Sequence, residues 1–322
     1  MKALVLKSPE SELSYEDFEL PKPGNGEVRI QVKAAALNHR DVWITKGQYS
    51  KIQYPTILGS DVAGLLDDRE VILNPGIGWG TETSFPHKDF HILGMPSYGG
   101  FAEEVIIHSD QVFDKPQHLS FEQAAALPLA GVTAYRAMFT KGKIQAEDKV
   151  LITGIGGGVA LMAFQFALAM GATVFVTSGS PEKLAQATEM GAAGAVNYRD
   201  PDWSKQLKEM AGGFNLIIDS AGGSGFSQLL YLTRPGAKVV TYGGSKGVVP
   251  DISPQLIFWR QLSILGTSMG SPREFANMLS FVRERKIVPI VDSTFDLADG
   301  QRAFARMEEG LQFGKLVLAG VD

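Results

Sequence analysis

The second half of the chain alternates short apolar runs with helix-like stretches. Six runs have the composition of buried strands, at residues 150–153, 172–177, 195–197, 214–219, 237–242 and 262–266. Helix-like stretches at 159–170 and 181–190 separate the first three. Continuous apolar strands that alternate with helices are typical of a parallel sheet covered on both faces, with right-handed crossovers. The pattern therefore predicts a doubly wound α/β domain here.

The first 120 residues follow a different pattern. Residues 28–33 alternate apolar and polar side chains, as in a strand with one exposed face. Residues 71–73 and 101–108 are further short β-like runs, separated by Pro and Gly turns. We expect an antiparallel, barrel-like β domain. Residues 116–119 then lead into the second domain, where Ser120 and Gln123 have the spacing of a capping box and predict a helix start.

Composition and charge narrow the possible classes of protein. The chain has 322 residues, enough for two domains, and its 44% hydrophobic and 20% charged residues are typical of a globular protein. The net charge of −5 is not concentrated in a block, so we expect no nucleic-acid surface. Residues 1–7 are too soon interrupted for a signal peptide, and no apolar run predicts a membrane span. The absence of cysteine excludes disulfides and thiolate catalysis and fits a cytoplasmic protein.

A glycine cluster follows the first strand of the α/β domain, at Gly154, Gly156, Gly157 and Gly158. A strand, a glycine turn and a helix N-terminus offer backbone N–H groups and a positive dipole end to a pyrophosphate. The last glycine of the usual dinucleotide pattern is replaced by Ala160. Other predicted strands also end in small or polar residues, at Ser220, Ala221 and Gly243, which is where ligands bind in such sheets. The alternative is a turn that only allows close helix packing.

The end of the second strand indicates which dinucleotide binds. The sequence there is Ser178-Gly179-Ser180, without an acidic residue, and Lys183 follows. NAD-binding domains place a carboxylate at this point for the ribose hydroxyls, whereas small hydroxyl donors and a cation suit the 2′-phosphate of NADP. We therefore predict NADPH as the cofactor. The alternative is a simple turn followed by an exposed lysine.

Several motifs occur together in one order and spacing: 36–41 (Ala-Leu-Asn-His-Arg-Asp), 55–64, 124–128, 131–135 and the glycine turn. With these motifs the chain resembles the medium-chain dehydrogenase/reductase superfamily, in particular its zinc-free quinone-oxidoreductase-like branch. The resemblance runs from residues 1–5 to residues 314–318. It implies an α/β fold in which a GroES-like β-barrel catalytic domain (1–118 and 266–322) carries an inserted Rossmann doubly wound parallel sheet (119–265). The implied site lies in the cleft between them. Residues 65–70 replace a longer hairpin of the family.

The resemblance also implies roles for individual residues. Asn38 and Tyr49 would line the reacting centre, with Trp43 as an aromatic wall, while Asp41 and Asp61 orient neighbouring groups. Cofactor contacts are expected at Asn38, Thr133, Gly154, Gly156, Gly157, Gly158, Val159, Ser178, Gly179, Ser180, Lys183, Tyr198, Ser220, Ala221, Gly243, Ser268, Met269 and Lys315. Each has a structural alternative. Asn38 can bridge turn backbone, Tyr49 can be a core edge, Thr133 can lie at the start of a helix over 134–140, and Lys315 can be an exposed strand residue.

The zinc-ligand positions of the family are occupied here by Asn38, Ser60, Asp61 and Leu129. An amide, a hydroxyl and an isobutyl group do not replace two thiolates and an imidazole around tetrahedral zinc, so we predict no metal. Without a Lewis acid, reduction of a quinone or an α,β-unsaturated carbonyl is easier than alcohol oxidation. The sequence thus predicts an NADPH-dependent reductase of small molecules, a homodimer joined through the strand at 262–266. The alternatives are an alcohol dehydrogenase with unusual metal ligands and a non-catalytic NADPH-binding protein.

Overall fold

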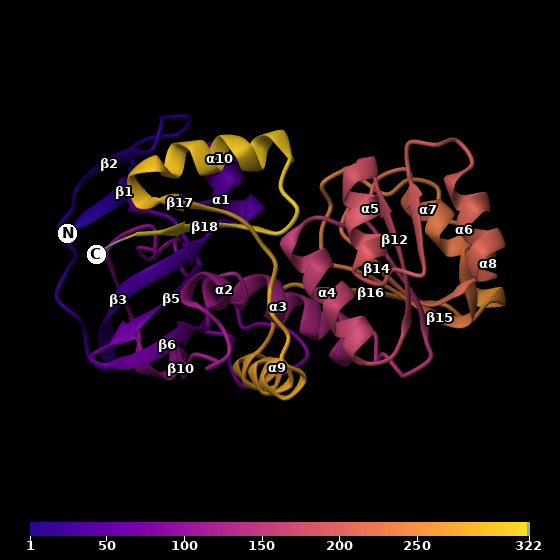
Figure 1. Cartoon of the computed structure of the whole chain (residues 1–322), viewed down its shortest axis with the longest axis horizontal. Coiled ribbons are helices and arrows are strands. Elements are labelled where there is room, and N and C mark those ends of the chain that lie inside the picture. The colour runs from indigo at the N-terminus through magenta and orange to yellow at the C-terminus, as the bar shows by residue number, and fades with distance from the viewer. Residues whose placement is uncertain (321–322) are drawn as a thin grey trace. The chain divides into compact units, whose positions relative to one another are not determined.

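The computed structural model describes residues 1–320, which form two compact units (Figure 1). One unit comprises Met1–Ala130 and the chain from Gly270 onward, and the other comprises Gly131–Met269. The sequence analysis places the nucleotide-binding domain at 119–265, so the second unit begins later than expected. The reason is that helix α2 (Phe121–Ala125) packs against strands β3 (Glu27–Ala36) and β5 (Asp61–Leu66) of the first unit.

The second unit contains the predicted doubly wound sheet. Its six parallel strands have the order β13-β12-β11-β14-β15-β16. In chain order they are β11 (Lys149–Ile152), β12 (Thr173–Ser178), β13 (Gly194–Asn197), β14 (Phe214–Asp219), β15 (Thr233–Thr241) and β16 (Ser263–Gly266). The order reverses between β11 and β14, and ligands bind at the carboxyl ends of strands beside such a reversal.

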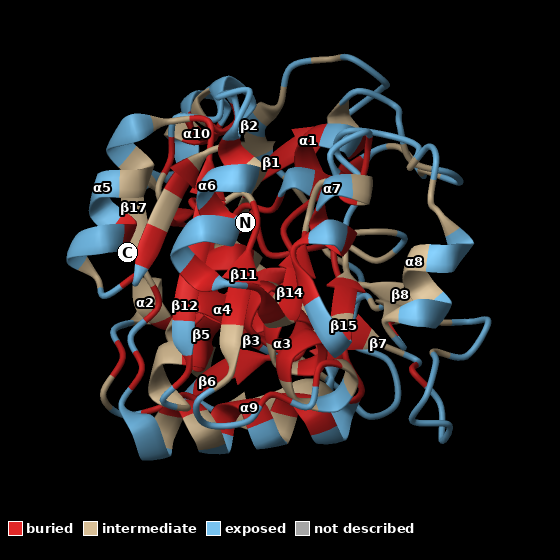
Figure 2. Ribbon diagram, turned by 90° about the vertical axis from the view of Figure 1, so that its right-hand side faces the viewer, coloured by how far each residue is buried: buried red, intermediate tan, exposed pale blue. Residues whose placement is uncertain are grey.

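Helices alternate with these strands as the apolar pattern predicts. They are α4 (Gly158–Ala169), α5 (Pro181–Glu189), α6 (Trp203–Ala211), α7 (Phe226–Tyr231) and α8 (Pro254–Trp259). Strands β11, β12 and β14 are almost completely buried, and Leu151, Ile217 and Val239 lie in one core cluster. Figure 2 shows β11 and β14 as buried and α8 as largely exposed.

The first unit is a β domain that the C-terminal segment completes. Its largest sheet has the order β10-β6-β5-β3-β18-β17, with β9 also paired to β3. The further strands of this sheet are β6 (Arg69–Leu73), β9 (Glu104–His108), β10 (Val112–Asp114), β17 (Val291–Asp296) and β18 (Lys315–Ala319). Strand β18 is antiparallel to β3, so the C-terminal strand shares a sheet with a strand from the N-terminal part of the chain (Figure 1). The predicted GroES-like architecture is confirmed.

Smaller elements complete this unit. A three-stranded sheet joins β1 (Lys2–Leu6), β2 (Ser14–Asp17) and β4 (Thr56–Ile57), and β7 (Gly76–Ile77) pairs with β8 (His91–Ile92). The helices are α1 (His39–Thr45), α9 (Pro272–Arg285) and α10 (Gly300–Glu309). Among residues 1–320, no helix combines the length and apolar composition that a membrane crossing requires.

The short segment at 65–70 forms a tight hairpin. Leu66 of β5 pairs with Arg69 of β6, which leaves Asp67 and Asp68 as a two-residue turn. Asp67 has a φ of 52°, a left-handed conformation that Asp tolerates better than most residues. The missing residues therefore shorten the connection without removing either strand.

Local sequence correctly predicts the start of one helix, α2, but not the start of the next, α3. The predicted capping box is confirmed, because the Ser120 N–H donates to Gln123 Oε1 (3.0 Å) and the Gln123 N–H donates to Ser120 Oγ (3.2 Å). The helix expected over 134–140 instead begins at Pro128 as α3 (Pro128–Tyr135) and continues as a π-helical turn over Arg136–Lys141. Proline suits the first turn of a helix because its missing N–H has no partner there. Thr133 therefore lies inside α3, and its alternative role at a helix start is wrong.

Candidate active site

The glycine turn after β11 is shaped to receive an anion. Gly154 and Gly156 have φ of +67° and +122°, values that side chains rarely adopt. The turn is anchored to β12, since the Ile155 N–H donates to the Thr177 carbonyl (2.8 Å). A Cβ built on Gly157, the N-cap of α4, would meet no atom within 4 Å. This open space in front of a helix N-terminus fits the pyrophosphate of a dinucleotide.

The neighbouring strand ends are joined to this turn. Thr153 Oγ1 donates to Asp219 Oδ1 (2.8 Å) and accepts from the Ser220 N–H (3.2 Å). A Cβ on Gly154 would lie 3.0 Å from Ser220 Oγ, and one on Gly243 would lie 2.6 Å from the Ser220 carbonyl oxygen. The structure thus brings together Gly154, Ser220 and Gly243, as expected for one nucleotide-binding edge.

Thr133 and Met269, both expected to contact the cofactor, are also neighbours. Thr133 Oγ1 lies 4.0 Å from Met269 Sδ, and both side chains are buried. Met269 and Ser268 follow β16, at the same end of the sheet as the glycine turn. The proposed cofactor residues of the second unit therefore line the carboxyl ends of its strands.

The ribose end contains two charged residues that are not among the predicted cofactor contacts, Glu182 and Arg199. Ser180 is the N-cap of α5, where its Oγ accepts from the Lys183 N–H (3.3 Å) and donates to the carboxylate of Glu182. That hydrogen bond lowers the pKa of Glu182. Arg199 lies beside Gly179, since a Cβ there would be 2.8 Å from Arg199 Nε and 2.8 Å from the Tyr198 hydroxyl. Arg199 is the second residue after the predicted third strand, and a basic residue so close to a strand end was the signal that could have revealed it.

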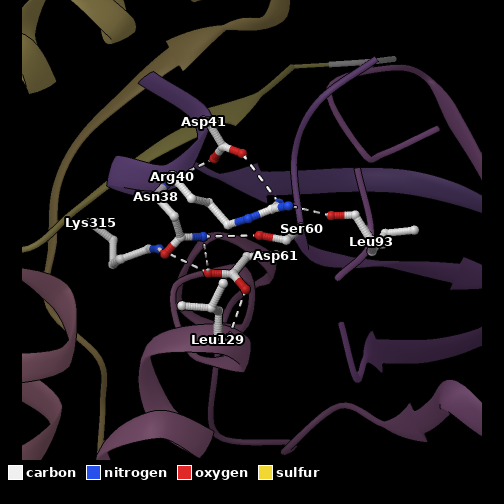
Figure 3. Close-up of polar contacts among 8 residues, drawn as sticks. All are labelled: Asn38, Arg40, Asp41, Ser60, Asp61, Leu93, Leu129 and Lys315. Carbon is white, nitrogen blue, oxygen red and sulfur yellow. Dashed lines mark hydrogen bonds and ion pairs between the residues drawn. The ribbon is translucent and has the colours of Figure 1, made fainter. Parts of the chain in front are cut away.

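The first unit contains a buried polar cluster of Asn38, Asp61 and Lys315 (Figure 3). Lys315 Nζ donates to Asn38 Oδ1 (2.7 Å) and to Asp61 Oδ2 (2.9 Å). Asn38 Nδ2 in turn donates to Asp61 Oδ2 (3.0 Å) and to Ser60 Oγ (3.2 Å). The other oxygen of Asp61 accepts from the Leu129 N–H (2.7 Å), near the start of α3. All polar atoms of the Asn38 amide are therefore engaged inside the protein.

Lys315 is 4% exposed, so its alternative role as a surface strand residue is wrong. Its ammonium group forms a buried ion pair with Asp61.

The same cluster affects whether a metal ion could bind at the positions matched to the family's zinc ligands. An ammonium 2.9 Å from the Asp61 carboxylate opposes a second cation by charge repulsion. Within residues 1–320, no three His, Cys, Asp or Glu side chains gather in a group that could hold a metal. The donor set does not fit zinc.

A second buried pair lies next to this cluster. Asp41 Oδ2 accepts from the Asn38 N–H (2.8 Å), while Asp41 Oδ1 lies 3.8 Å from Arg40 Nη1. Burial raises the pKa of Asp41 to about 6, against the opposing charge of Arg40. The Arg40 guanidinium carbon is 5.7 Å from the ring centre of Tyr49, which packs against the core. Trp43 is exposed on α1.

The buried ion pair predicts a strong coupling between two positions. Lys315→Met leaves the Asp61 charge buried without its cation, so it should lower the free energy of unfolding by about 3–5 kcal/mol. Asp61→Asn combined with Lys315→Met removes both charges and should recover much of this loss. Urea denaturation of the single and double variants measures the coupling. Additive losses would contradict a direct ion pair.

Asp41 predicts a specific pH dependence. The folded protein binds its proton more tightly than the unfolded chain, so the stability that Asp41 contributes is complete below pH ~4 and is lost as the pH rises through about 6. Asp41→Asn keeps an acceptor for the Asn38 N–H but stays neutral. The unfolding free energy of this variant, relative to the native protein, should rise by about 3 kcal/mol across that window. A difference independent of pH, measured by urea denaturation between pH 4 and 7.5, would refute the raised pKa.

Comparison with known proteins agrees with this architecture. Residues 24–117 match the family described as "Alcohol dehydrogenase GroES-like domain", and residues 158–284 match "Zinc-binding dehydrogenase". A zinc-type alcohol dehydrogenase-like protein, YogA, from Leptosphaeria maculans is 36% identical, with 92% of each chain covered. The quinone oxidoreductase of Mus musculus is 30% identical, with 94% of this chain and 92% of that protein covered.

Solved structures give the same result. An NAD-dependent alcohol dehydrogenase superposes with a TM-score of 0.93 at 35% identity, covering 99% of this chain and 100% of the other. The quinone oxidoreductase of Thermus thermophilus, a protein also solved with NADPH, has a TM-score of 0.84 at 28% identity over 99% of this chain and 100% of the other. With its Rossmann sheet, its GroES-like unit and these relatives, the chain belongs to the medium-chain dehydrogenase/reductase superfamily, in the quinone-oxidoreductase-like branch.

Proposed function

We propose that this oxidoreductase is NADPH-dependent and metal-independent, and that it transfers hydride to a quinone or an α,β-unsaturated carbonyl compound. The observation that carries the proposal is the buried Asn38–Asp61–Lys315 cluster, in which an ammonium group contacts two side chains at positions matched to the family's zinc ligands. Alcohol oxidation in the zinc-dependent enzymes relies on a Lewis acid to stabilise an alkoxide. A site whose cation is a lysine favours a reaction that needs only hydrogen bonds and a proton.

Reduction of an enone or a quinone meets that condition. The nicotinamide, when bound, supplies a hydride, which carries two electrons to the electrophilic carbon. The carbonyl oxygen then gains negative charge as an enolate or phenolate, and one proton completes the reduction. Hydrogen-bond donors can stabilise that oxygen without a metal, with each directly acting donor contributing about 2.7–4 kcal/mol.

Asn38 and Tyr49 are the side chains proposed to line the reacting centre. The Asn38 amide is held rigidly by Lys315, Asp61 and Ser60, so it presents a fixed polar wall rather than a free donor. Tyr49 is only partly buried, and its hydroxyl makes no hydrogen bond within residues 1–320. Tyr49 is therefore the better candidate to donate to the substrate oxygen.

The ribose end supports NADPH over NADH. The turn after β12 has no acidic residue at Ser178, Gly179 or Ser180, and Lys183 extends over Gly156, where a Cβ would lie 2.7 Å from Lys183 Cδ. Glu182 is the nearest acid along the turn, and its carboxylate accepts from Ser180 Oγ. A turn without an acidic residue, with the Arg199 side chain beside Gly179, favours the dianionic 2′-phosphate.

The proposal predicts NADPH oxidation with 1,4-benzoquinone or simple enones, unchanged by chelation. Tyr49→Phe should lower kcat by about tenfold or more if its hydroxyl contacts the substrate oxygen, and should leave the Kd of NADPH nearly unchanged. Tyr231→Phe, the same change at an exposed tyrosine of α7, is the matched control. Activity that chelation abolishes and zinc restores would refute metal independence. Oxidation of simple alcohols without any quinone or enone reduction would refute the reaction class.

We also propose a homodimer joined through β16. This strand lies at the edge of the six-stranded sheet, and an unpaired edge is a site for association. The helix before it ends in Phe258 and Trp259, which are 52% and 78% exposed and form an apolar surface for a second copy. Light scattering at micromolar concentration should give twice the chain mass. Trp259→Lys should shift this mass toward the monomer, and a native monomer would refute the dimer.

A further inference from the structure

Arg199 has a fixed place at the ribose end of the second unit. It follows Tyr198 directly after β13, and its backbone N–H donates to Asn197 Oδ1 (2.9 Å). The Tyr198 N–H donates to the Ser178 carbonyl (3.1 Å), which ties this segment to the end of β12. These backbone contacts hold Arg199 next to the strand end where dinucleotide-binding domains contact the adenosine ribose.

The Arg199 side chain reaches toward the turn rather than away from it. A Cβ on Gly179 would lie 2.8 Å from Arg199 Nε, so the guanidinium group lies across this glycine. Gly179 occupies the turn where an NAD-binding domain places its ribose-binding carboxylate. The Arg199 side chain makes no hydrogen bond or ion pair with any residue of the described range 1–320. Its donors are therefore available to an anion.

Lys183, the other cation of this region, lies elsewhere. Its Nζ is 3.4 Å from the position of a Cβ on Gly156, inside the glycine turn rather than beside Gly179. The glycine turn is where the pyrophosphate fits, and both NAD and NADP have a pyrophosphate. The two cations are thus placed toward different parts of a dinucleotide.

We infer that Arg199 binds the 2′-phosphate of NADP and determines the preference for NADP over NAD, whereas Lys183 contributes to binding of both cofactors through the pyrophosphate. This inference rests on the proposed NADPH dependence. The planar guanidinium group can offer two parallel N–H donors to a dianionic phosphate, a geometry that an ammonium group lacks. The Tyr198 hydroxyl, also 2.8 Å from the Gly179 Cβ position, is placed to assist.

The test is fluorescence titration of the purified full chain with NADPH and with NADH. Arg199→Ala should raise the Kd of NADPH by about tenfold or more and change that of NADH by less than about twofold. Arg199→Lys should recover part of the NADPH affinity, because it keeps the charge without the planar donor pair. Lys183→Ala should weaken both cofactors by similar factors. Lys205→Ala, an exposed lysine on α6, is the matched control and should change neither.

A smaller probe isolates the adenosine end. Arg199→Ala should weaken binding of adenosine 2′,5′-bisphosphate and leave binding of adenosine 5′-monophosphate unchanged. A native protein that prefers NADPH, with the same preference in Arg199→Ala, would overturn the role of Arg199 and leave the proposed function intact. Equal affinity of the native protein for NADPH and NADH would overturn both. Equal weakening of the two cofactors by Arg199→Ala would also overturn the role.

Discussion

The ion pair between Lys315 and Asp61 is the interaction on which the first unit depends most. It joins the start of β18 to the start of β5, and through Asn38 and Leu129 it reaches the N-cap of α1 and the first turn of α3. These segments are far apart in the sequence. A buried charge is costly unless it is paired, so each partner constrains the position of the other. The C-terminal strand is therefore required for the order of the polar cluster as well as for the sheet.

The same ion pair limits the chemistry of the unit. Because Lys315 satisfies one oxygen of Asp61 and the α3 backbone satisfies the other, the carboxylate has little capacity left for a metal ion. Asn38 is fixed by three polar contacts and cannot rotate without breaking one of them. Burial raises the pKa of the neighbouring Asp41, and the charge of Arg40 only partly offsets this effect. These contacts hold the polar groups of the cluster in fixed orientations.

The second unit depends on a different constraint, which is space for an anion next to backbone N–H groups. The two positive-φ glycines turn the chain sharply after β11, and Gly157 leaves the front of α4 open. Side chains on the adjoining strand ends then determine which dinucleotide fits. Glu182 hydrogen-bonds to Ser180, whereas Lys183 and Arg199 extend over two different glycines. The charge around the glycine turn and the end of β12 therefore depends on residues of α5 and of the segment after β13.

The sequence by itself determined the features that local periodicity and local hydrogen bonds control. The six buried strands, the alternation along β3, the capping box at Ser120 and the glycine turn all follow from residues a few positions apart. Only the tertiary structure decided that Lys315 is buried against Asp61, that Arg199 lies across Gly179, that α2 packs with the first unit and that α3 begins at Pro128. These features depend on contacts between segments that are far apart in the sequence. The pattern of neighbouring residues does not specify which distant charge or apolar face a side chain will contact.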